Sequence, residues 1–254
     1  MKFLILAGGY GKRFRRVLTN TPKPMAPVGN LPFLEYMIYQ ISSQGFKDII
    51  LCVGYKGDEI INYFKDGRHW SVTIDYSMEK KPLGTAGAIK LASSRFNDQN
   101  FIVMNDDSML GLDFQELISF HMMNNAKATI ALVKVNDVKR FGRVVLKRDG
   151  TIENFIEKNS SGQGYINAGV YILNREILNL IPEGKRYSLE KKVFPRLRGK
   201  GLYGRYFNDA FFIDIGLPES YLQVKDQPER LHSVINIHRK EKFRDNQGKG
   251  TIED

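Results

Sequence analysis

The stretch FLILAGGYGKRF, residues 3–14, decides how the rest of the chain is organised. Four apolar residues, 3–6, lead directly into three glycines and two basic residues. A short apolar run bounded by glycines is typical of a buried strand that ends in a turn. The start resembles an export signal only briefly, because its apolar stretch is too short and no cleavage site follows. We therefore predict a first buried strand here.

The same apolar pattern recurs through the first half of the chain and alternates with amphipathic stretches. Strands are predicted at residues 3–6, 49–53, 72–76 and 101–104, and helices at 33–43, 58–64, 86–94 and 112–123, the last with Asp113 as its cap. Alternating strands and helices of these lengths form βαβ units around a largely parallel sheet. The expected fold is therefore α/β and Rossmann-like, with a mixed, mainly parallel central sheet flanked by helices.

Closely spaced strand-like stretches follow in the second half. They lie at residues 128–135, 143–147, 151–157 and 165–173, with short helices at 176–180 and 189–197 and late strands at 202–207 and 211–213. Asp149-Gly150 is a strong signal for a hairpin turn. This half is therefore predicted to add antiparallel or mixed strands to the first sheet.

The composition narrows the class of ligand. The net charge is +10, and basic residues gather in one cluster at residues 12–23 and another at 239–249. The first is interleaved with glycines and prolines, which favours phosphorylated small molecules, whereas the second includes acids and is typical of a solvated helix face. We expect no membrane partner, since no apolar run is long enough to cross a bilayer. We expect no nucleic-acid partner either, since the sequence shows no recognised nucleic-acid-binding module. Cys52, the single cysteine, is predicted to be a buried hydrophobe, and a cytoplasmic location is expected.

The glycine turn has the features of a phosphate-binding loop. Successive backbone N–H groups can surround phosphate oxygens, Arg13 can clamp a pyrophosphate, and Lys23 stands between two prolines as a fixed point charge. A P-loop would need Ser or Thr where Arg13 stands, and a dinucleotide fingerprint would need Gly where Phe14 stands. The alternative is a glycine-rich turn with exposed basic residues.

Acidic residues follow two short apolar strands. Asp106 and Asp107 come after residues 101–104, and Asp214 comes after 211–213. Ligands of open α/β sheets bind outside the carboxyl ends of the strands, so these acids can converge. Magnesium takes one or two protein carboxylates and completes its octahedron with phosphates and water. Asp107 and Asp214 are the predicted ligands, the alternative for each being a turn or cap acid.

The histidines carry no such pattern. His69, His121, His232 and His238 lack the spacing of a metal site or a catalytic triad and are expected to be surface or helix residues.

Together these motifs resemble those of the sugar-phosphate nucleotidyltransferases, the NDP-sugar pyrophosphorylases. The matching segments are Gly8-Gly9-Tyr10-Gly11-Lys12-Arg13, Pro22-Lys23-Pro24, Pro82-Leu83-Gly84-Thr85-Ala86-Gly87, Asn105-Asp106-Asp107-Ser108, Phe141-Gly142, Glu157-Lys158, Asn167-Ala168-Gly169 and Asp214-Ile215-Gly216. The resemblance covers roughly residues 1 to 225. It implies a nucleotidyltransferase domain over 1–225, with a nucleotide half of about 1–125 and a sugar-side half of about 126–225, and then a helical, polar tail over 226–254.

The resemblance also implies roles for particular residues. The catalytic residues are expected to be Arg13, Lys23 and Asp107, with Mg²⁺ on Asp107 and Asp214. The nucleotide-binding residues are expected to be Leu6, Ala7, Gly8, Gly9, Gly11, Lys12, Arg13, Pro82, Gly84, Thr85, Ala86, Gly87 and Asp106. The residues that bind the sugar phosphate are expected to be Gly142, Glu157, Lys158, Asn167 and Gly169.

The chain departs from the family pattern at three positions. Lys12 stands where Thr or Ser is usual, Asp106 where Gly is usual, and Asn159 where Pro often follows Glu-Lys. We expect these changes to affect efficiency and sugar choice more than the reaction itself.

The branch of the family is indicated by residues 25–28, 32–36, 76–77 and 188–191, which resemble the D-glycero-α-D-manno-heptose 1-phosphate guanylyltransferases. The expected reaction is GTP with D-glycero-α-D-manno-heptose 1-phosphate, giving the GDP-heptose and pyrophosphate. Residues 83–87 are also similar to mannose-1-phosphate guanylyltransferases, which leaves mannose 1-phosphate open, as well as uridylyl or thymidylyl transfer to a hexose 1-phosphate. A non-catalytic sugar-nucleotide-binding regulator is a further alternative, and a homo-oligomer is a possible assembly.

Overall fold

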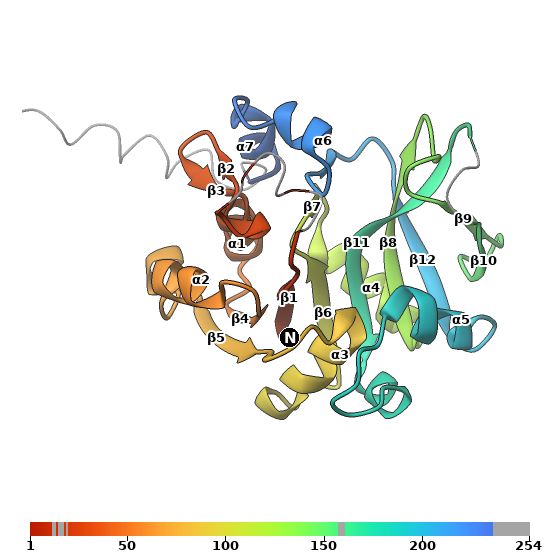
Figure 1. Cartoon of the computed structure of the whole chain (residues 1–254). Coiled ribbons are helices and arrows are strands. Elements are labelled where there is room, and N and C mark those ends of the chain that lie inside the picture. Colours follow the sequence, from red (N-terminus) through yellow and green to blue (C-terminus); the bar gives the residue numbers. More distant parts are fainter. Residues whose placement is uncertain (12–13, 15–17, 19, 157–160, 236–254) are drawn as a thin grey trace, which may run out of the picture.

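The computed structural model describes residues 1–11, 14, 18, 20–156 and 161–235. Its centre is a mixed sheet (Figure 1). The strands of this sheet are β1 (Phe3–Ala7), β4 (Asp48–Val53), β5 (Thr73–Met78), β6 (Asn100–Asn105), β8 (Ala128–Val135), β9 (Arg143–Leu146), β10 (Ile152–Ile156), β11 (Gly164–Asn174) and β12 (Leu202–Phe207).

The sheet is mainly parallel. Strands β5, β4, β1 and β6 lie side by side and run in the same direction. Strand β11 is antiparallel to β6 and to β8, and β12 is parallel to β8. Along the path β5-β4-β1-β6-β11-β8-β12, only β11 therefore runs the opposite way. The predicted fold class is confirmed.

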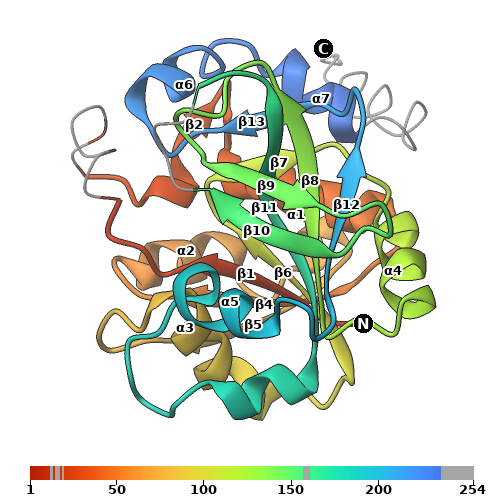
Figure 2. The same ribbon diagram turned by 90° about the vertical axis from the view of Figure 1, so that its right-hand side faces the viewer.

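The antiparallel strands of the second half join the sheet through β11. Val170–Asn174 of this long strand pair with β6, whereas Tyr165 nearer its start pairs with Val144 of β9. Strands β9 and β10 form the predicted hairpin, in which the carboxylate of Asp149 accepts a hydrogen bond from the N–H of Thr151 at 2.9 Å. Figure 2 shows β9, β10, β11, β8 and β12 together on one side of the molecule.

Both faces of the sheet are buried because residues of each central strand point alternately to opposite sides. In β1, Phe3, Ile5 and Ala7 belong to one hydrophobic cluster, whereas Leu4 and Leu6 belong to the other. Helices α1 (Phe33–Ser43) and α4 (Phe114–Met123) cover the first cluster. Helices α3 (Gly84–Ala92) and α5 (Phe194–Leu197) cover the second. The unbroken apolar run 3–6 is thus the mark of a strand buried on both faces.

The remaining elements are short. They include α2 (Gly57–Phe64), α6 (Pro218–Leu222), α7 (Glu229–Ile235), the 3₁₀ turn η2 (Lys23–Met25) and two small antiparallel sheets, β2 (Pro27–Val28) with β3 (Leu31–Pro32), and β7 (Ser108–Leu110) with β13 (Phe212–Asp214). Asp113 caps α4 as predicted, accepting from the N–H of Gln115 at 2.7 Å. The predicted tail begins with α7, and residues 236–254 lie outside the described part of the chain.

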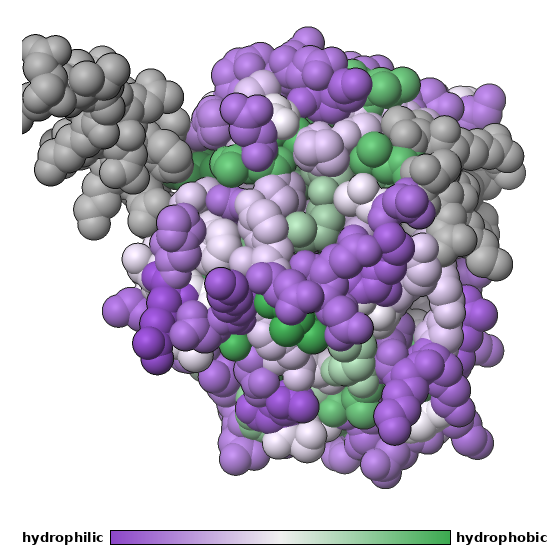
Figure 3. Space-filling view, turned by 60° about the vertical axis from the view of Figure 1, so that its left-hand side comes forward, coloured by the Kyte–Doolittle hydropathy of each residue, from purple (hydrophilic) through white to green (hydrophobic). Residues whose placement is uncertain are grey.

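On the face shown in Figure 3, hydrophilic residues predominate and the described hydrophobic residues gather in small separate patches. Within the ranges that the structure describes, no helix is both long enough and apolar enough to span a bilayer. Cys52 is buried as predicted, and this burial raises the pKa of its thiol to about 12, which keeps it unreactive.

His121 is a helix residue, as expected, but it is buried. Its side chain on α4 contacts Thr129 Oγ1 through Nδ1 at 2.9 Å and Asn100 Oδ1 through Nε2 at 3.2 Å. Because the amide oxygen of Asn100 can only accept, Nε2 carries the proton and Nδ1 accepts from the Thr129 hydroxyl. Burial lowers the pKa of His121 from 6.5 to about 4, so the ring is neutral in the folded protein.

This burial predicts acid sensitivity of the fold. Between pH 6.5 and pH 4 the unfolded chain binds a proton at His121 that the folded chain does not, so stability falls as the pH is lowered through this window. The shift implies a loss of about 2 kcal/mol between pH 7 and pH 5. Urea unfolding at the two pH values should show a correspondingly smaller pH dependence for His121→Leu. An unchanged pH dependence in that variant would contradict the assignment.

Candidate active site

Two carboxylates are brought together by the small sheet of β7 and β13. Asp107 immediately precedes β7, and Asp214 ends β13 opposite Ser108. The backbone N–H of Ile215 donates to the carbonyl oxygen of Asp107 at 2.7 Å, which fixes the two chain segments to each other. A Cβ at Gly216 would lie 2.8 Å from Asp214 Oδ1 and 3.1 Å from Asp107 Oδ2, so both carboxylates flank the same glycine. The predicted convergence of the two acids is present in the fold.

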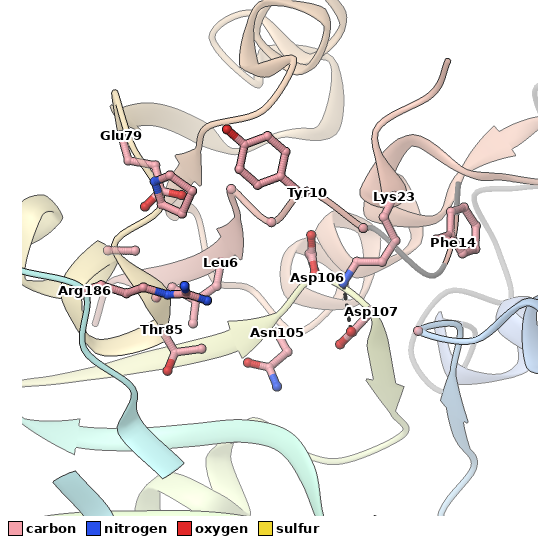
Figure 4. Close-up of a pocket in the computed structure, with 17 residues that line it drawn as sticks. Leu6, Tyr10, Phe14, Lys23, Glu79, Thr85, Asn105, Asp106, Asp107 and Arg186 are labelled. Carbon is pink, nitrogen blue, oxygen red and sulfur yellow. Dashed lines mark hydrogen bonds and ion pairs between the residues drawn. The ribbon is translucent and has the colours of Figure 1, made fainter. Parts of the chain in front are cut away.

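The side-chain amine of Lys23 lies between the carboxylates of Asp106 and Asp107. Its Nζ is 2.7 Å from Asp106 Oδ1 and 2.8 Å from Asp107 Oδ2 (Figure 4). Pro22 and Pro24 fix the backbone on both sides, because the proline ring restricts its own φ and the conformation of the preceding residue. The structure thus places a cation from η2 against two acids that directly follow β6.

The charges in this group are strongly coupled. Burial by itself would lower the pKa of Lys23, but the charges of Asp106 and Asp107 outweigh it and hold that pKa above its ordinary value. Burial, together with the charge of Asp107, raises the pKa of Asp106 to about 6, against the attraction of Lys23. The pKa of Asp214 is also raised, first by burial and then by the charge of Asp107. Arg140 Nη2 offsets part of this at 3.2 Å from Asp214 Oδ2.

Lys23, Asp106 and Asp107 line one end of a cavity of about 480 Å³, and Asp214 is not among its lining residues. The cavity is walled by the turn after β1, the loop that leads into α3 and the end of β6. Its lining residues are Leu6, Gly8, Gly9, Tyr10, Gly11, Phe14, Lys23, Glu79, Pro82, Gly84, Thr85, Ala88, Asn105, Asp106, Asp107, Arg186 and Gly216. The structure therefore brings the glycine turn, the 82–85 loop and the acids around one space, as the sequence predicted.

The other predicted site residues that the structure describes do not line this cavity. Ala86 and Gly87 donate their backbone N–H groups to the carbonyl oxygen of Tyr187, at 3.0 and 3.2 Å. Ala7 is buried in β1. Gly142 precedes β9 and has φ +84°. Lys12, Arg13, Glu157 and Lys158 lie outside the described residues.

Asn167 and Gly169 form a kink in β11 beside the acids. The side-chain oxygen of Asn167 accepts from the N–H of Gly169 at 2.9 Å, and its amide donates to the hydroxyl of Tyr171 at 3.0 Å. Gly169 has φ +80°, and a Cβ there would lie 2.2 Å from Ser108 Oγ. The glycine therefore lets β11 pack directly against the start of β7.

A left-handed backbone conformation accounts for only one of the three glycines in the glycine turn. Gly11 has φ +54°, a conformation that favours glycine. Gly8 and Gly9 do not have a positive φ. Gly8 is needed for close packing instead, because a Cβ there would lie 2.6 Å from the carboxylate oxygen Oε1 of Glu79, whereas nothing lies within 4 Å of a Cβ at Gly9.

The lining side chains that the sequence analysis did not select as site residues are Tyr10, Phe14, Glu79, Ala88, Asn105 and Arg186. The ring of Tyr10 packs on that of Tyr55 with a centroid distance of 5.3 Å. Arg186 belongs to the segment that docks on α3, where Thr85 Oγ1 donates to Glu190 Oε2 at 3.0 Å. Glu79 lies three residues before Pro82, the first residue of a matched motif, and this proximity was its only sequence signal. Nothing in the sequence pointed to Arg186.

Residues 2–230 match the family described as nucleotidyl transferase, and the chain belongs to this family of enzymes. This confirms the resemblance that the sequence motifs indicated.

Individual relatives are similar over most of the chain. A D-glycero-alpha-D-manno-heptose 1-phosphate guanylyltransferase from Aneurinibacillus thermoaerophilus is 38% identical over 235 residues, covering 92% of this chain and 100% of that protein. A mannose-1-phosphate guanyltransferase from Yarrowia lipolytica is 38% identical over 228 residues, covering 87% of this chain and 62% of that protein. The crystal structure of HddC from Yersinia pseudotuberculosis complexed with GMP-PN has a TM-score of 0.78 at 34% identity, covering 88% of this chain and 97% of that one.

Proposed function

We propose that the chain transfers GMP from GTP to D-glycero-α-D-manno-heptose 1-phosphate, forming the GDP-heptose and pyrophosphate. The observation that carries this proposal is the placement of Lys23 and Asp107 at the end of a cavity that the glycine turn also lines, with Asp214 beside Asp107 across Gly216. The heptose 1-phosphate guanylyltransferase that aligns along its whole length supports the choice of sugar. The HddC structure complexed with GMP-PN supports a guanine nucleotide.

The reaction is an in-line displacement at the α-phosphorus of GTP. A phosphate oxygen of the sugar 1-phosphate forms the new bond to this phosphorus, and the bond to the oxygen that bridges to the β-phosphate breaks, releasing pyrophosphate. Catalysis of this kind depends on positioning and on neutralising charge. Lys23 supplies a cation between two anionic phosphates that repel each other, and the backbone of Gly8, Gly9 and Gly11 allows the triphosphate to approach closely.

The remaining roles in the proposal rest on the sequence motifs. Arg13 binds the leaving pyrophosphate, and Lys158 binds the phosphate of the sugar. Gly142, Glu157 and Asn167 contact sugar hydroxyls from the sugar-side half of the domain. Asp106 and the 82–87 loop belong to the nucleotide half.

The donor set fits magnesium. Among the described residues no cluster of three or more His, Cys, Asp or Glu side chains can hold a metal ion, but Asp107 and Asp214 flank one glycine, and the charge of Asp107 adds to burial in raising the pKa of Asp214. Magnesium characteristically uses one or two carboxylates and takes its other ligands from phosphates and water. When bound there, it would neutralise phosphate charge and orient the triphosphate.

Mannose 1-phosphate is the second candidate acceptor, because a mannose-1-phosphate guanyltransferase is equally identical over the matched residues. The deciding experiment measures pyrophosphate release with ATP, CTP, GTP and UTP, each with heptose 1-phosphate and with mannose 1-phosphate. We expect the highest kcat/KM for GTP with the heptose phosphate. A higher kcat/KM with mannose 1-phosphate would make that sugar phosphate the acceptor in place of the heptose phosphate. A preference for UTP would overturn the guanylyl assignment.

A further inference from the structure

Asp106 is a buried carboxylate to which the proposed reaction assigns no step. It directly follows β6 and lines the cavity, yet it is only 4% exposed. Its Oδ1 lies 2.7 Å from Lys23 Nζ. Its Oδ2 is also buried and has no hydrogen-bond partner within the part of the chain that the structure describes. Among these residues, Lys23 is therefore the cation that compensates the charge of Asp106.

The same amine also holds the oxygen at which a divalent cation would bind. Lys23 Nζ lies 2.8 Å from Asp107 Oδ2, and this oxygen faces Gly216, on which Asp214 also borders. The side chain of Asp107 is 32% exposed, whereas that of Asp106 is 5% exposed. Two cations on one oxygen repel each other. A divalent cation between Asp107 and Asp214 would therefore displace Lys23 from Asp107, while Asp106 stays buried beside the lysine.

The number of N–H donors limits what Lys23 can offer to a phosphate. A lysine ammonium group has three donors. In the ligand-free protein two of them are directed at Asp106 and Asp107, which leaves one at most for a phosphate oxygen. Moving Lys23 away from Asp106 would leave a buried carboxylate without its cation, and this is strongly unfavourable. A second donor for the phosphate must therefore come from the contact with Asp107.

The charge balance of this group also disfavours an anion. The described side chains that are linked here comprise two cations, Lys23 and Arg140, and three carboxylates, Asp106, Asp107 and Asp214. With all of them ionised, the group has one more negative charge than positive charges, and a polyphosphate brought against it is repelled. Without Asp106 the charges would balance, so this buried carboxylate supplies the excess.

We propose that Asp106 makes the binding of a polyphosphate at this site depend on a divalent cation. In the ligand-free protein, Asp106 and Asp107 together hold the amine of Lys23. When a divalent cation is bound at Asp107, Lys23 keeps its contact with Asp106 and turns the N–H that it directed at Asp107 toward the phosphate. This inference rests on the proposed use of a nucleoside triphosphate, and it assigns to Asp106 the control over when Lys23 becomes available.

The test measures the binding of inorganic tripolyphosphate by isothermal titration calorimetry, once in EDTA and once in magnesium. This probe has neither base nor sugar, so its affinity reports on the phosphate-binding groups alone. The unmodified enzyme should bind it more tightly in magnesium than in EDTA. Asp106→Asn keeps the size of the side chain and removes its charge. In this variant the affinity in EDTA should rise roughly tenfold or more, the effect of one hydrogen bond to a charged group, while the affinity in magnesium changes little.

The matched control is Glu79→Gln, which removes one negative charge from the same cavity at the end far from Lys23 (Figure 4). It should change the affinity in EDTA by less than about threefold, because charges across a solvent-filled cavity are screened. Equal gains in the two variants would show that only the total charge matters and would overturn the role of Asp106. A lower affinity of Asp106→Asn in EDTA would also overturn it, since Asp106 would then hold Lys23 ready for the phosphate.

Asp106→Gly is a second variant, with the residue that is usual at this position of the sequence motif, and it should show the same gain in EDTA. The test therefore does not depend on the folding of one variant. Tripolyphosphate that fails to bind even in magnesium would overturn the proposed function together with this inference. Magnesium-dependent binding to the unmodified enzyme, without a gain in either Asp106 variant, would overturn this inference alone.

Discussion

Asp107→Asn is expected to lower kcat for pyrophosphate release by about 100- to 1,000-fold, the usual loss when one charged transition-state contact is removed. The asparagine side chain has the same size and can still accept a hydrogen bond from Lys23, but it has lost the negative charge that faces Asp214 across Gly216. The fold should be retained. Steady-state kinetics in a series of magnesium concentrations measure the effect.

Asp106→Asn is the matched control for this variant. Asp106 contacts the same Lys23 amine but does not flank Gly216, so its loss removes a partner of Lys23 without removing a proposed metal ligand. We expect a loss of kcat within about tenfold, the range of a single hydrogen bond. Equal losses in the two variants would mean that Asp107 acts only by holding Lys23. Near-normal turnover by Asp107→Asn would remove it from the reaction altogether.

Lys23→Met is expected to damage stability and activity together. Asp106 is only 5% exposed, and Lys23 at 2.7 Å is the cation that compensates its charge. Breaking a buried pair by removing one partner typically costs about 3–5 kcal/mol, because the other charge stays buried. Urea unfolding should show a loss of this size, and pyrophosphate release should fall by about 100-fold or more, since a transition-state cation is lost as well.

The double variant Lys23→Met with Asp106→Asn separates the two effects. Removing the buried negative charge should restore much of the unfolding free energy, because the cost in the single variant arises from the uncompensated carboxylate. Activity should not return, since the cation between the phosphates is still missing. Recovery of turnover in the double variant would show that Lys23 serves the fold and not the reaction, and an unchanged stability in Lys23→Met would contradict the burial argument.

The elements of the fold could be predicted because each depends on a local pattern. The apolar run in β1 and the amphipathic spacing of α1 reflect which faces are buried, and the Asp149-Gly150 turn and the Asp113 cap depend on neighbouring backbone atoms. The short strand β7 was not predicted. It has three residues, and its partner β13 lies in a distant part of the chain, so no local period reveals it.

The candidate site was predictable where it consists of motifs and unpredictable where it depends on how segments meet. The glycine turn, Lys23, Asp107 and Asp214 could be selected because each lies at the end of a predicted strand or between prolines. The sequence did not show that Asp106 shares the amine of Lys23, nor that Glu79 and Arg186 reach the same cavity. The N–H groups of Ala86 and Gly87 contact Tyr187, which the motif alone could not indicate.

The sequence by itself determined the class of fold, the order of its elements and the types of side chain available for catalysis. It could do so because hydrophobic periodicity, turn residues and charge are properties of short segments. The tertiary structure alone decided which of the charged groups meet. Lys23 and Asp107 are 84 residues apart in the chain, and their 2.8 Å contact exists only because β1 and β6 pair side by side and bring their carboxyl ends together. Interactions between charges depend on distance in space, and that distance is set by strand pairing far from the residues themselves.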